Sequence, residues 1–247
     1  MQAFPYTRLH CSTWNVDQAG ALLFCSTRRA DELGIAQEKR IHPLSSSESN
    51  HMTPVAARDD LATCAGAGIA GRAALEGAGL ALSEVDLVEL YTCFPIAVET
   101  YADALGLSLA RDLTVTGSMA YAGGPFNNYV IQATCRMAER LRAGDGKHGL
   151  VSSVSGVLTK QGFGVWSRVP GRNGFAWRDV SEAVAQATPC KPIVDAVKNW
   201  TKGNPKEITP AKLASSSSRI ARSAAACSAR GNLRAFTQAA RALRALA

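Results

Sequence analysis

One stretch of the chain reads Ala122-Gly123-Gly124-Pro125-Phe126-Asn127-Asn128-Tyr129. The segment before it, 113–117, predicts a short strand, and the segment after it, 127–142, predicts a long helix. Adjacent glycines leave no Cβ in the way of a close approach to the backbone. Unpaired N–H groups at a helix start favour a carbonyl oxygen or an anion. The stretch therefore predicts a strand–turn–helix unit with a binding site at its turn, although the turn lacks a side chain suited to chemistry.

The rest of the pattern predicts strands alternating with helices. Further strands are expected at 19–25, 41–44, 85–90, 149–155 and 164–167, the last two being antiparallel partners. Helices are expected from a Ser26 or Thr27 cap to Gly34, over 61–78, and from Pro95 to about Leu105 with Gly106 as the stop. The polar segment 45–51 is expected to be a loop. This alternation predicts an α/β fold with a mixed five-stranded sheet covered by helices.

The composition is that of a soluble globular protein. The chain has 247 residues, of which 47% are hydrophobic and 19% are charged,. No apolar run reaches the roughly 18 residues of a membrane span, and no signal peptide is visible at the N-terminus. The seven cysteines include no Cys-x-x-Cys pair. We therefore expect no metal site and no disulfide framework, and we predict a reducing, cytoplasmic setting.

The positive charge is concentrated at the C-terminus. Residues 189–247 hold eleven Lys/Arg and two Asp/Glu, whereas residues 1–188 are nearly neutral. A basic tail can contact nucleic acid or anionic lipid, but a solvated appendage is the interpretation that we favour, with no nucleic-acid partner. The last segment, 232–247, is at best a short basic amphipathic helix, for which a membrane-surface role is the alternative to a loosely docked helix.

Four segments, in order, resemble the C-terminal half of the thiolase superfamily. They are 14–19, which reads Trp-Asn-Val-Asp-Gln-Ala, 85–94, which ends in Tyr-Thr-Cys-Phe, 116–125, which ends in Gly-Gly-Pro, and 149–156, which ends in Val-Ser-Gly. The resemblance is greatest to the sterol-carrier-type, thiolase-like acetyl-CoA acetyltransferases. It implies an acyltransferase of lipid or sterol metabolism that takes a coenzyme A thioester as substrate or ligand and needs no further cofactor.

The chain departs from the family at three positions that carry the chemistry. Gly124 stands where the family has its activating histidine, Tyr91 where it has an Asn or His, and Val154 where it has a cysteine. Glycine and valine transfer no proton, and the ordinary pKa of a tyrosine, about 10, suits it poorly as a base at neutral pH. The N-terminal half, which carries the family's nucleophile, is not part of this sequence. We therefore expect this chain to be impaired or inactive on its own.

The candidate site residues follow from the same resemblance. Tyr91 and Gly124 are positional equivalents of catalytic residues, and His51 is the best remaining general base, with a purely structural role as its alternative. The resemblance implies coenzyme A contacts at Ser12, Thr13, Phe94, Gly123 and Asn127. Asn127 or Asn128 also suits the cap of the long helix. Cys93 is expected to pack as a small hydrophobic residue, with a nucleophilic role as the alternative.

Three hypotheses for function remain open. The first is a thiolase-like acyl-CoA acyltransferase whose partner is an N-terminal thiolase half or a second copy of the chain. The second is a non-catalytic protein that binds acyl-CoA or a protein partner. The third is a truncated gene product. For any of these, the expected organisation is a thiolase-like domain over 1–170, a connecting segment over 171–200 and an irregular basic tail over 201–247.

Overall fold

Five strands form one mixed sheet in the order β2-β3-β4-β1-β5. A computed structural model describes residues 6–190 of the chain. The strands are β1 (His42–Ser49), β2 (Leu87–Glu89), β3 (His148–Ser155), β4 (Lys160–Ser167) and β5 (Ala176–Asp179). β4 is antiparallel to both β1 and β3, whereas β2 is parallel to β3 and β5 is parallel to β1. The carboxyl ends of β1, β2 and β3 therefore lie at the same edge of the sheet.

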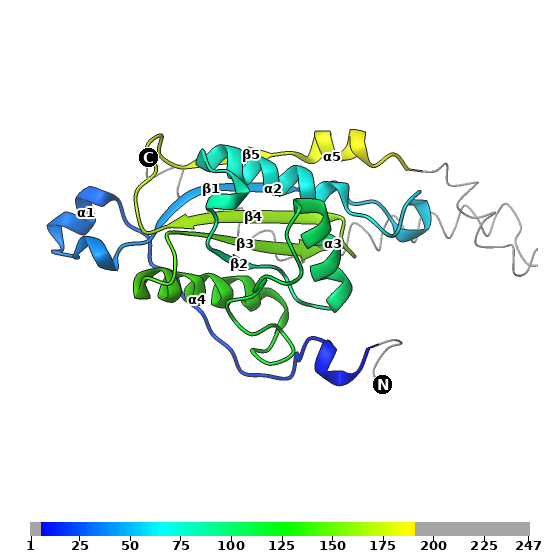
Figure 1. The fold of residues 1–247 in the computed structure, drawn as a ribbon, viewed down its shortest axis with the longest axis horizontal. Helices are drawn as coiled ribbons and strands as arrows, with labels where there is room; N and C mark the ends of the chain where they lie inside the picture. The colour runs from blue at the N-terminus through cyan, green and yellow to red at the C-terminus, as the bar shows by residue number, and fades with distance from the viewer. Residues whose placement is uncertain (1–5, 191–247) are drawn as a thin grey trace, which may run out of the picture.

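The helices form layers on the two faces of the sheet (Figure 1). They are α1 (Thr27–Glu32), α2 (Ala65–Ala78), α3 (Pro95–Leu105), α4 (Tyr129–Ala143) and α5 (Ser181–Ala187). Short 3-10 helices are η1 (Arg8–His10), η2 (Gln37–Lys39), η3 (Val55–Ala57), η4 (Leu82–Glu84) and η5 (Phe126–Asn128). The expected α/β fold with a mixed five-stranded sheet is confirmed for the part of the chain that the structure describes.

Two hydrophobic cores, one on each face, hold these layers together. Leu150 and Val154 of β3 pack in the core that contains α2 and α3, whereas Val151 packs in the core that contains α4. This alternation is what a strand covered on both faces requires, because successive side chains point to opposite sides. The α2 side of the core is built largely of alanines, including Ala67, Ala70 and Ala74, so the helix packs closely on the sheet.

The expected loop at 45–51 is wrong over most of its length, because β1 continues to Ser49. Ser45 Oγ and Ser47 Oγ donate hydrogen bonds of 2.5 Å to the carbonyl oxygens of Ala74 and Ala70 in α2. The strand also pairs with both β4 and β5. The serines are thus small polar residues in a buried strand, and their hydroxyl groups find partners on the covering helix.

Two further strand predictions are wrong. Residues 19–25 form no strand, and Leu23 is 99% exposed. This segment instead runs beside α4, where the Cys135 thiol lies 3.4 Å from the carbonyl oxygen of Ala21,. Residues 113–117 also form no strand, because the N–H groups of Val115 and Thr116 donate to the Glu89 side chain rather than to a neighbouring strand.

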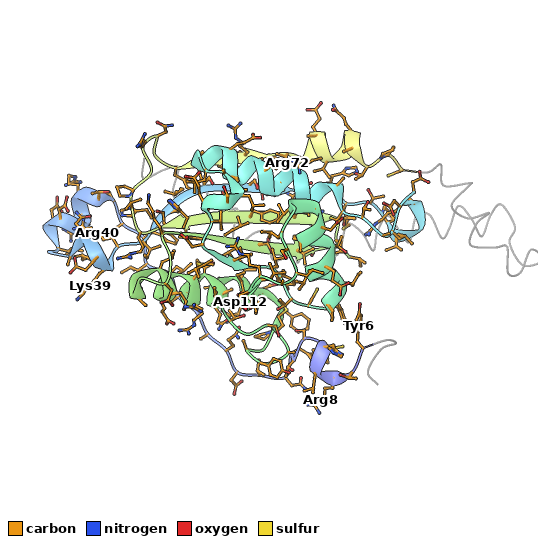
Figure 2. All side chains as sticks on the ribbon, viewed as in Figure 1. Tyr6, Arg8, Lys39, Arg40, Arg72 and Asp112 are labelled. Carbon is orange, nitrogen blue, oxygen red and sulfur yellow. The ribbon has the colours of Figure 1, made fainter. Side chains whose placement is uncertain are left out.

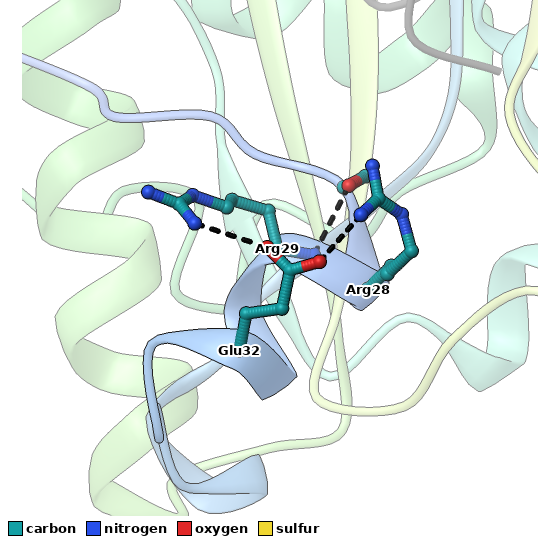
Figure 3. A network of polar contacts seen from close by, with 4 residues as sticks. Arg28, Arg29 and Glu32 are labelled. Atoms are coloured by element: carbon teal, nitrogen blue, oxygen red, sulfur yellow. Dashed lines mark hydrogen bonds and ion pairs between the residues drawn. The ribbon is translucent and has the colours of Figure 1, made fainter.

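The start of α1 and both ends of α3 agree with the local sequence signals. α3 begins at Pro95 and ends before Gly106, whose φ of 75° lies in the left-handed region that glycine tolerates,. Ser26 caps α1 by accepting a hydrogen bond from the N–H of Arg29. Arg28 and Arg29 then both bond to Glu32 on the surface of this short helix (Figure 3).

Charged side chains lie on widely separated parts of the surface. Arg72 projects from α2, whereas Tyr6 and Arg8 lie on the N-terminal segment beyond α4 (Figure 2). Within residues 6–190, no helix is long and apolar enough to cross a membrane. β5 and α5 follow residue 170 and pack beside β1 and α2. The amphipathic pattern at 232–247 lies outside the described residues.

Candidate functional site

The glycine turn is held by an N-terminal segment more than 100 residues away in the sequence. The N–H of Gly124 donates to the Thr13 carbonyl oxygen over 2.8 Å, and the N–H of Thr13 donates to the Met119 carbonyl oxygen over 3.0 Å. Ser12 donates through its N–H to the Cys93 carbonyl oxygen over 3.2 Å. The fold therefore brings the turn together with Ser12, Thr13 and the start of α3, three of the regions that the sequence predicts to contact coenzyme A.

The space beside the two glycines is already filled. A Cβ on Gly124 would collide with Ser12 Oγ and lie 2.9 Å from Met119 Sδ, closer than real Cβ atoms approach their neighbours. A Cβ on Gly123 would lie 2.5 Å from Val16 Cγ2, and the φ of this residue, 84°, disfavours any side chain,. A side chain at residue 124 would therefore require the Ser12 and Met119 side chains to move.

Tyr91 and Val154 lie at the carboxyl ends of β2 and β3, at the same edge of the sheet. The Tyr91 ring packs edge-on against the Tyr129 ring with 5.5 Å between the ring centroids. The backbone N–H of Tyr91 donates to Ser152 Oγ over 2.9 Å. Val154 is buried in the α2–α3 core. This arrangement places a phenol group near the edge of the sheet, but Gly124 and Val154 supply no side chain that can exchange a proton.

A buried carboxylate, Glu89, organises the segment that leads into the turn. Its oxygens accept hydrogen bonds from the N–H groups of Val115 (2.6 Å) and Thr116 (3.0 Å), from the hydroxyl groups of Thr114 and Thr116 (3.0 Å each), and from the Tyr129 hydroxyl group. Burial raises the pKa of Glu89 although these donors oppose the shift. Sequence reasoning treated this residue only as part of a strand; the Thr-rich segment at 114–116 is the signal that could have marked it.

Thr92 links this network to the turn. Its Oγ1 accepts a hydrogen bond of 2.8 Å from the N–H of Met119 and lies 3.2 Å from the Tyr129 hydroxyl oxygen. Met119 in turn contacts Gly124 and accepts from Thr13. Because burial and the neighbouring Glu89 both raise the pKa of Tyr129, this phenol stays neutral and acts as a hydrogen-bond donor,. Glu89 therefore positions the turn through a continuous chain of hydrogen bonds and contacts.

Exposed aromatic rings flank the turn. Phe94 stacks on Tyr6 with 6.0 Å between centroids, and Trp14 packs edge-on against Phe126 with 5.8 Å between centroids. Both Phe94 and Phe126 are exposed. Asn127 is also exposed at the start of the η5–α4 unit. The turn thus lies between apolar surfaces that remain open to solvent within the described residues.

The expected asparagine cap of α4 is confirmed in position only, at Asn128. Asn128 precedes α4, but its side chain makes no capping hydrogen bond to that helix. Its Nδ2 instead donates to Gln18 Oε1 over 3.0 Å, and Gln18 Nε2 donates to the Ala122 carbonyl oxygen over 2.9 Å. The amide therefore ties the helix start to the N-terminal segment, a contact that no local sequence signal reveals.

Cys93 lies beside the turn as a packed side chain. It contacts both hydrophobic cores, and burial raises the pKa of its thiol. A raised pKa lowers the thiolate fraction at neutral pH. These observations support the packing role over the nucleophilic one.

His51 lies apart from the turn. It follows β1, which is separated from β2 by β3 and β4. Its Nε2 lies 3.1 Å from Thr53 Oγ1, and its ring lines a pocket of about 220 Å³ to which neither Tyr91 nor Gly124 contributes. Within residues 6–190, no cluster of three or more His, Cys, Asp or Glu side chains could hold a metal ion.

Comparisons with known proteins concern the fold rather than the site. The chain matches no family model. It is similar to the crystal structure of a monomeric SCP2-thiolase-like protein type 1 from Mycobacterium smegmatis, with 28% sequence identity and a TM-score of 0.55 over 59% of this chain. A second similar structure is human mitochondrial 3-ketoacyl-CoA thiolase, with 21% identity and a TM-score of 0.46 over 57% of this chain.

The chain spans 33% of the length of each of these two proteins. The similarity to the mycobacterial protein agrees with the four ordered segments that resemble thiolases. The described part of the chain has a thiolase-like fold, and the chain is related to the SCP2-thiolase-like proteins of the thiolase superfamily.

Proposed function

We propose that this chain is a thiolase-like protein of cytoplasmic lipid metabolism that binds an acyl-CoA thioester at the Gly123–Gly124 turn and transfers no acyl group by itself. One observation carries this proposal. The Ser12–Thr13 segment, the turn and Cys93 before α3 are joined by backbone hydrogen bonds beside exposed aromatic side chains, while Ser12 Oγ fills the space beside Gly124.

The turn has the features that binding needs. The exposed Asn127 offers the NH₂ group of its amide side chain to an acyl carbonyl oxygen or a phosphate,. Phe94 and Tyr6 form an apolar surface against which the pantetheine chain of an acyl-CoA can pack,. The Glu89 network holds the segment before the turn in place, so that little ordering is required on binding,.

The same surface lacks what acyl transfer needs. A thiol nucleophile requires a basic partner, and proton removal beside a thioester requires a group whose pKa lies near the working pH. Gly124 and Val154 supply neither, and the pKa of the Cys93 thiol is raised by burial. These substitutions support binding without turnover.

A second candidate is an acyltransferase completed by another chain, which would be an N-terminal thiolase half or a second copy of this chain. The exposed aromatic residues beside the turn favour it. Trp14, Tyr121 and Phe126 are each at least 60% exposed, which is a large apolar surface for three neighbouring segments,. In this case the partner would supply the nucleophile, and the turn would hold the substrate.

Calorimetric titration with acetyl-CoA and acetoacetyl-CoA tests the first proposal. We expect saturable binding that is weakened several-fold by Phe94→Ala, because the variant removes an apolar contact for the ligand. Val169→Ala is the matched control, since Val169 is 41% exposed, Phe94 is 42% exposed, and Val169 lies after β4 at the opposite edge of the sheet. An absence of saturable binding, or equal losses in the two variants, would refute binding at the turn.

A turnover assay separates the two candidates. We expect acetoacetyl-CoA cleavage at the background rate for the chain alone. Cleavage above background would contradict the non-catalytic proposal but would remain compatible with acyl-CoA binding. Cleavage that appears only when a thiolase N-terminal half is added would support the second candidate.

A further inference from the structure

Residues 18–26 run beside α4 without joining the sheet (Figure 1). Along this segment exposed and half-buried side chains alternate, as they do in a strand that has one covered face,. The exposed side chains are those of Ala19, Ala21, Leu23 and Cys25. Leu23 is 99% exposed. The segment therefore presents a row of apolar side chains to solvent.

The opposite side of the segment is packed on the body of the protein. Gly20 approaches α4 so closely that a Cβ would lie 3.0 Å from Ile131 Cγ2 and 3.1 Å from the backbone nitrogen of Gln132. The centroid of the Phe24 ring lies 6.3 Å from that of the Trp166 ring. Because these contacts hold one side inward, the other side stays directed to solvent.

The backbone of this segment lacks the hydrogen bonds of a strand. Within residues 6–190, no N–H or carbonyl group of residues 19–25 bonds to another backbone group. Exposed strand edges of this kind are templates for pairing with another chain, and proteins commonly protect them with charged residues or proline. Residues 18–27 contain neither. The segment is therefore an unprotected strand edge.

The two ends of the segment carry opposite charges. Asp17 precedes it, is exposed, and forms no ion pair with the residues that the structure describes. Arg28 and Arg29 follow it and share the single carboxylate of Glu32, so one positive charge is left unbalanced (Figure 3). An antiparallel second copy would place the acidic end of one chain beside the basic end of the other. The segment is thus complementary to itself.

We propose that residues 20–26 pair with the same residues of a second copy of this chain, as antiparallel strands about a twofold axis at Leu23. Directly opposite residues in such a pair lie on the same face. This register therefore keeps the exposed rows together, with Leu23 opposite Leu23 and Ala21 opposite Cys25 of the second copy. The interface is isologous, as a twofold axis requires. It does not depend on acyl-CoA binding at the glycine turn.

Sedimentation equilibrium at a series of chain concentrations tests the dimer. One pair of short strands buries less than the roughly 1,600 Å² of a standard interface, so we expect a reversible dimer. The average mass should rise with concentration from that of one chain towards that of two. A mass that stays at that of one chain overturns the proposal.

Leu23→Asp tests the position of the contact. The variant places two like charges opposite each other on the axis, and we expect dimerisation to weaken about ten-fold. Because Leu23 is fully exposed, the change removes no packing within one chain. Leu109→Asp is the matched control, since Leu109 is 63% exposed and follows α3. Equal losses in the two variants, or no loss in Leu23→Asp, would contradict pairing through this segment.

Disulfide trapping tests the register. Cα atoms of opposite residues in an antiparallel pair lie about 4.5–5.5 Å apart, which a disulfide bond can span. Cys25, Cys190 and Cys227 are first changed to serine to remove competing thiols. Oxidation with diamide should then link Leu23→Cys into a covalent dimer. Ala19→Cys is the control, because residue 19 lies on the same exposed side but far from its own copy in this register. Linkage that is absent at residue 23, or equal at both positions, refutes the register.

Discussion

Ser12 Oγ fills the space into which a Cβ on Gly124 would project. The two residues also share a hydrogen bond, because the Ser12 hydroxyl group donates to the Gly124 carbonyl oxygen over 3.4 Å. A side chain of the N-terminal segment therefore occupies the space beside Gly124.

Gly124→Ala is expected to destabilise the protein by about 1–3 kcal/mol, the range for overpacking a filled site. Urea unfolding measures this change. Ser12→Ala removes the atom that the new methyl group would meet, so the double variant Ser12→Ala with Gly124→Ala should be more stable than the sum of the single changes predicts. Strict additivity of the two changes would show that Ser12 is not what limits the space at Gly124.

Glu89→Gln is expected to destabilise the protein by about 2–4 kcal/mol, because an amide replaces one of two buried oxygens that accept five hydrogen bonds,. Thermal unfolding measures the change. Glu38→Gln serves as the control, since Glu38 is exposed in η2. If Glu89 positions the turn, Glu89→Gln should also weaken acyl-CoA binding in protein that remains folded at low temperature.

The same carboxyl group predicts a pH dependence. Burial raises the pKa of Glu89 above its ordinary value of 4.5, so the folded protein holds this proton more tightly than the unfolded chain does. Its contribution to stability is complete below pH 4.5 and is lost as the pH rises through the raised pKa. We expect the stability difference between the native chain and Glu89→Gln to shrink over that interval, and a difference that grows with pH would contradict the assignment.

His148 predicts the opposite dependence. It is buried at the start of β3, its Nδ1 has no hydrogen-bond partner, and burial followed by the charge of Lys147 lowers its pKa below 6.5. A histidine that is neutral when folded contributes stability above pH 6.5, and this contribution is lost as the pH falls through the lowered pKa. His148→Gln should therefore lose less stability than the native chain between pH 6.5 and pH 5. The pKa of His42 is also lowered, by burial and by the charge of Arg40. We therefore expect the stability of His148→Gln to keep some dependence on pH.

Ser47→Val tests why β1 is a strand. Ser47 Oγ donates to the Ala70 carbonyl oxygen of α2, and the larger apolar side chain would both lose this bond and crowd the helix. We expect a loss of about 1–3 kcal/mol in the free energy of unfolding despite the higher strand propensity of valine. Ser47→Ala, which removes the bond without adding bulk, should cost less, about 1 kcal/mol. A Ser47→Val variant as stable as the native chain would refute the close-packing explanation.

Several elements of this fold follow from local sequence signals alone. Pro95 and Gly106 mark both ends of α3 because each restricts or permits the backbone angles that start and stop a helix,. Ser26 marks the start of α1 in the same way. The glycine turn and the helix after it also follow from the sequence, as does the absence of proton-transfer side chains at residues 124 and 154.

Only the tertiary structure decided the rest, because the partners involved are distant in the chain. The serines of β1 predict a loop from the sequence alone. They fit a buried strand because carbonyl oxygens of α2 accept hydrogen bonds from their hydroxyl groups. Residues 113–117 predict a strand from the sequence alone. In the structure, the N–H groups of Val115 and Thr116 donate to the Glu89 side chain, a contact that the sequence does not show. The turn could be recognised from its glycines, but whether it was open or filled depended on Ser12, which reaches it only in the folded protein.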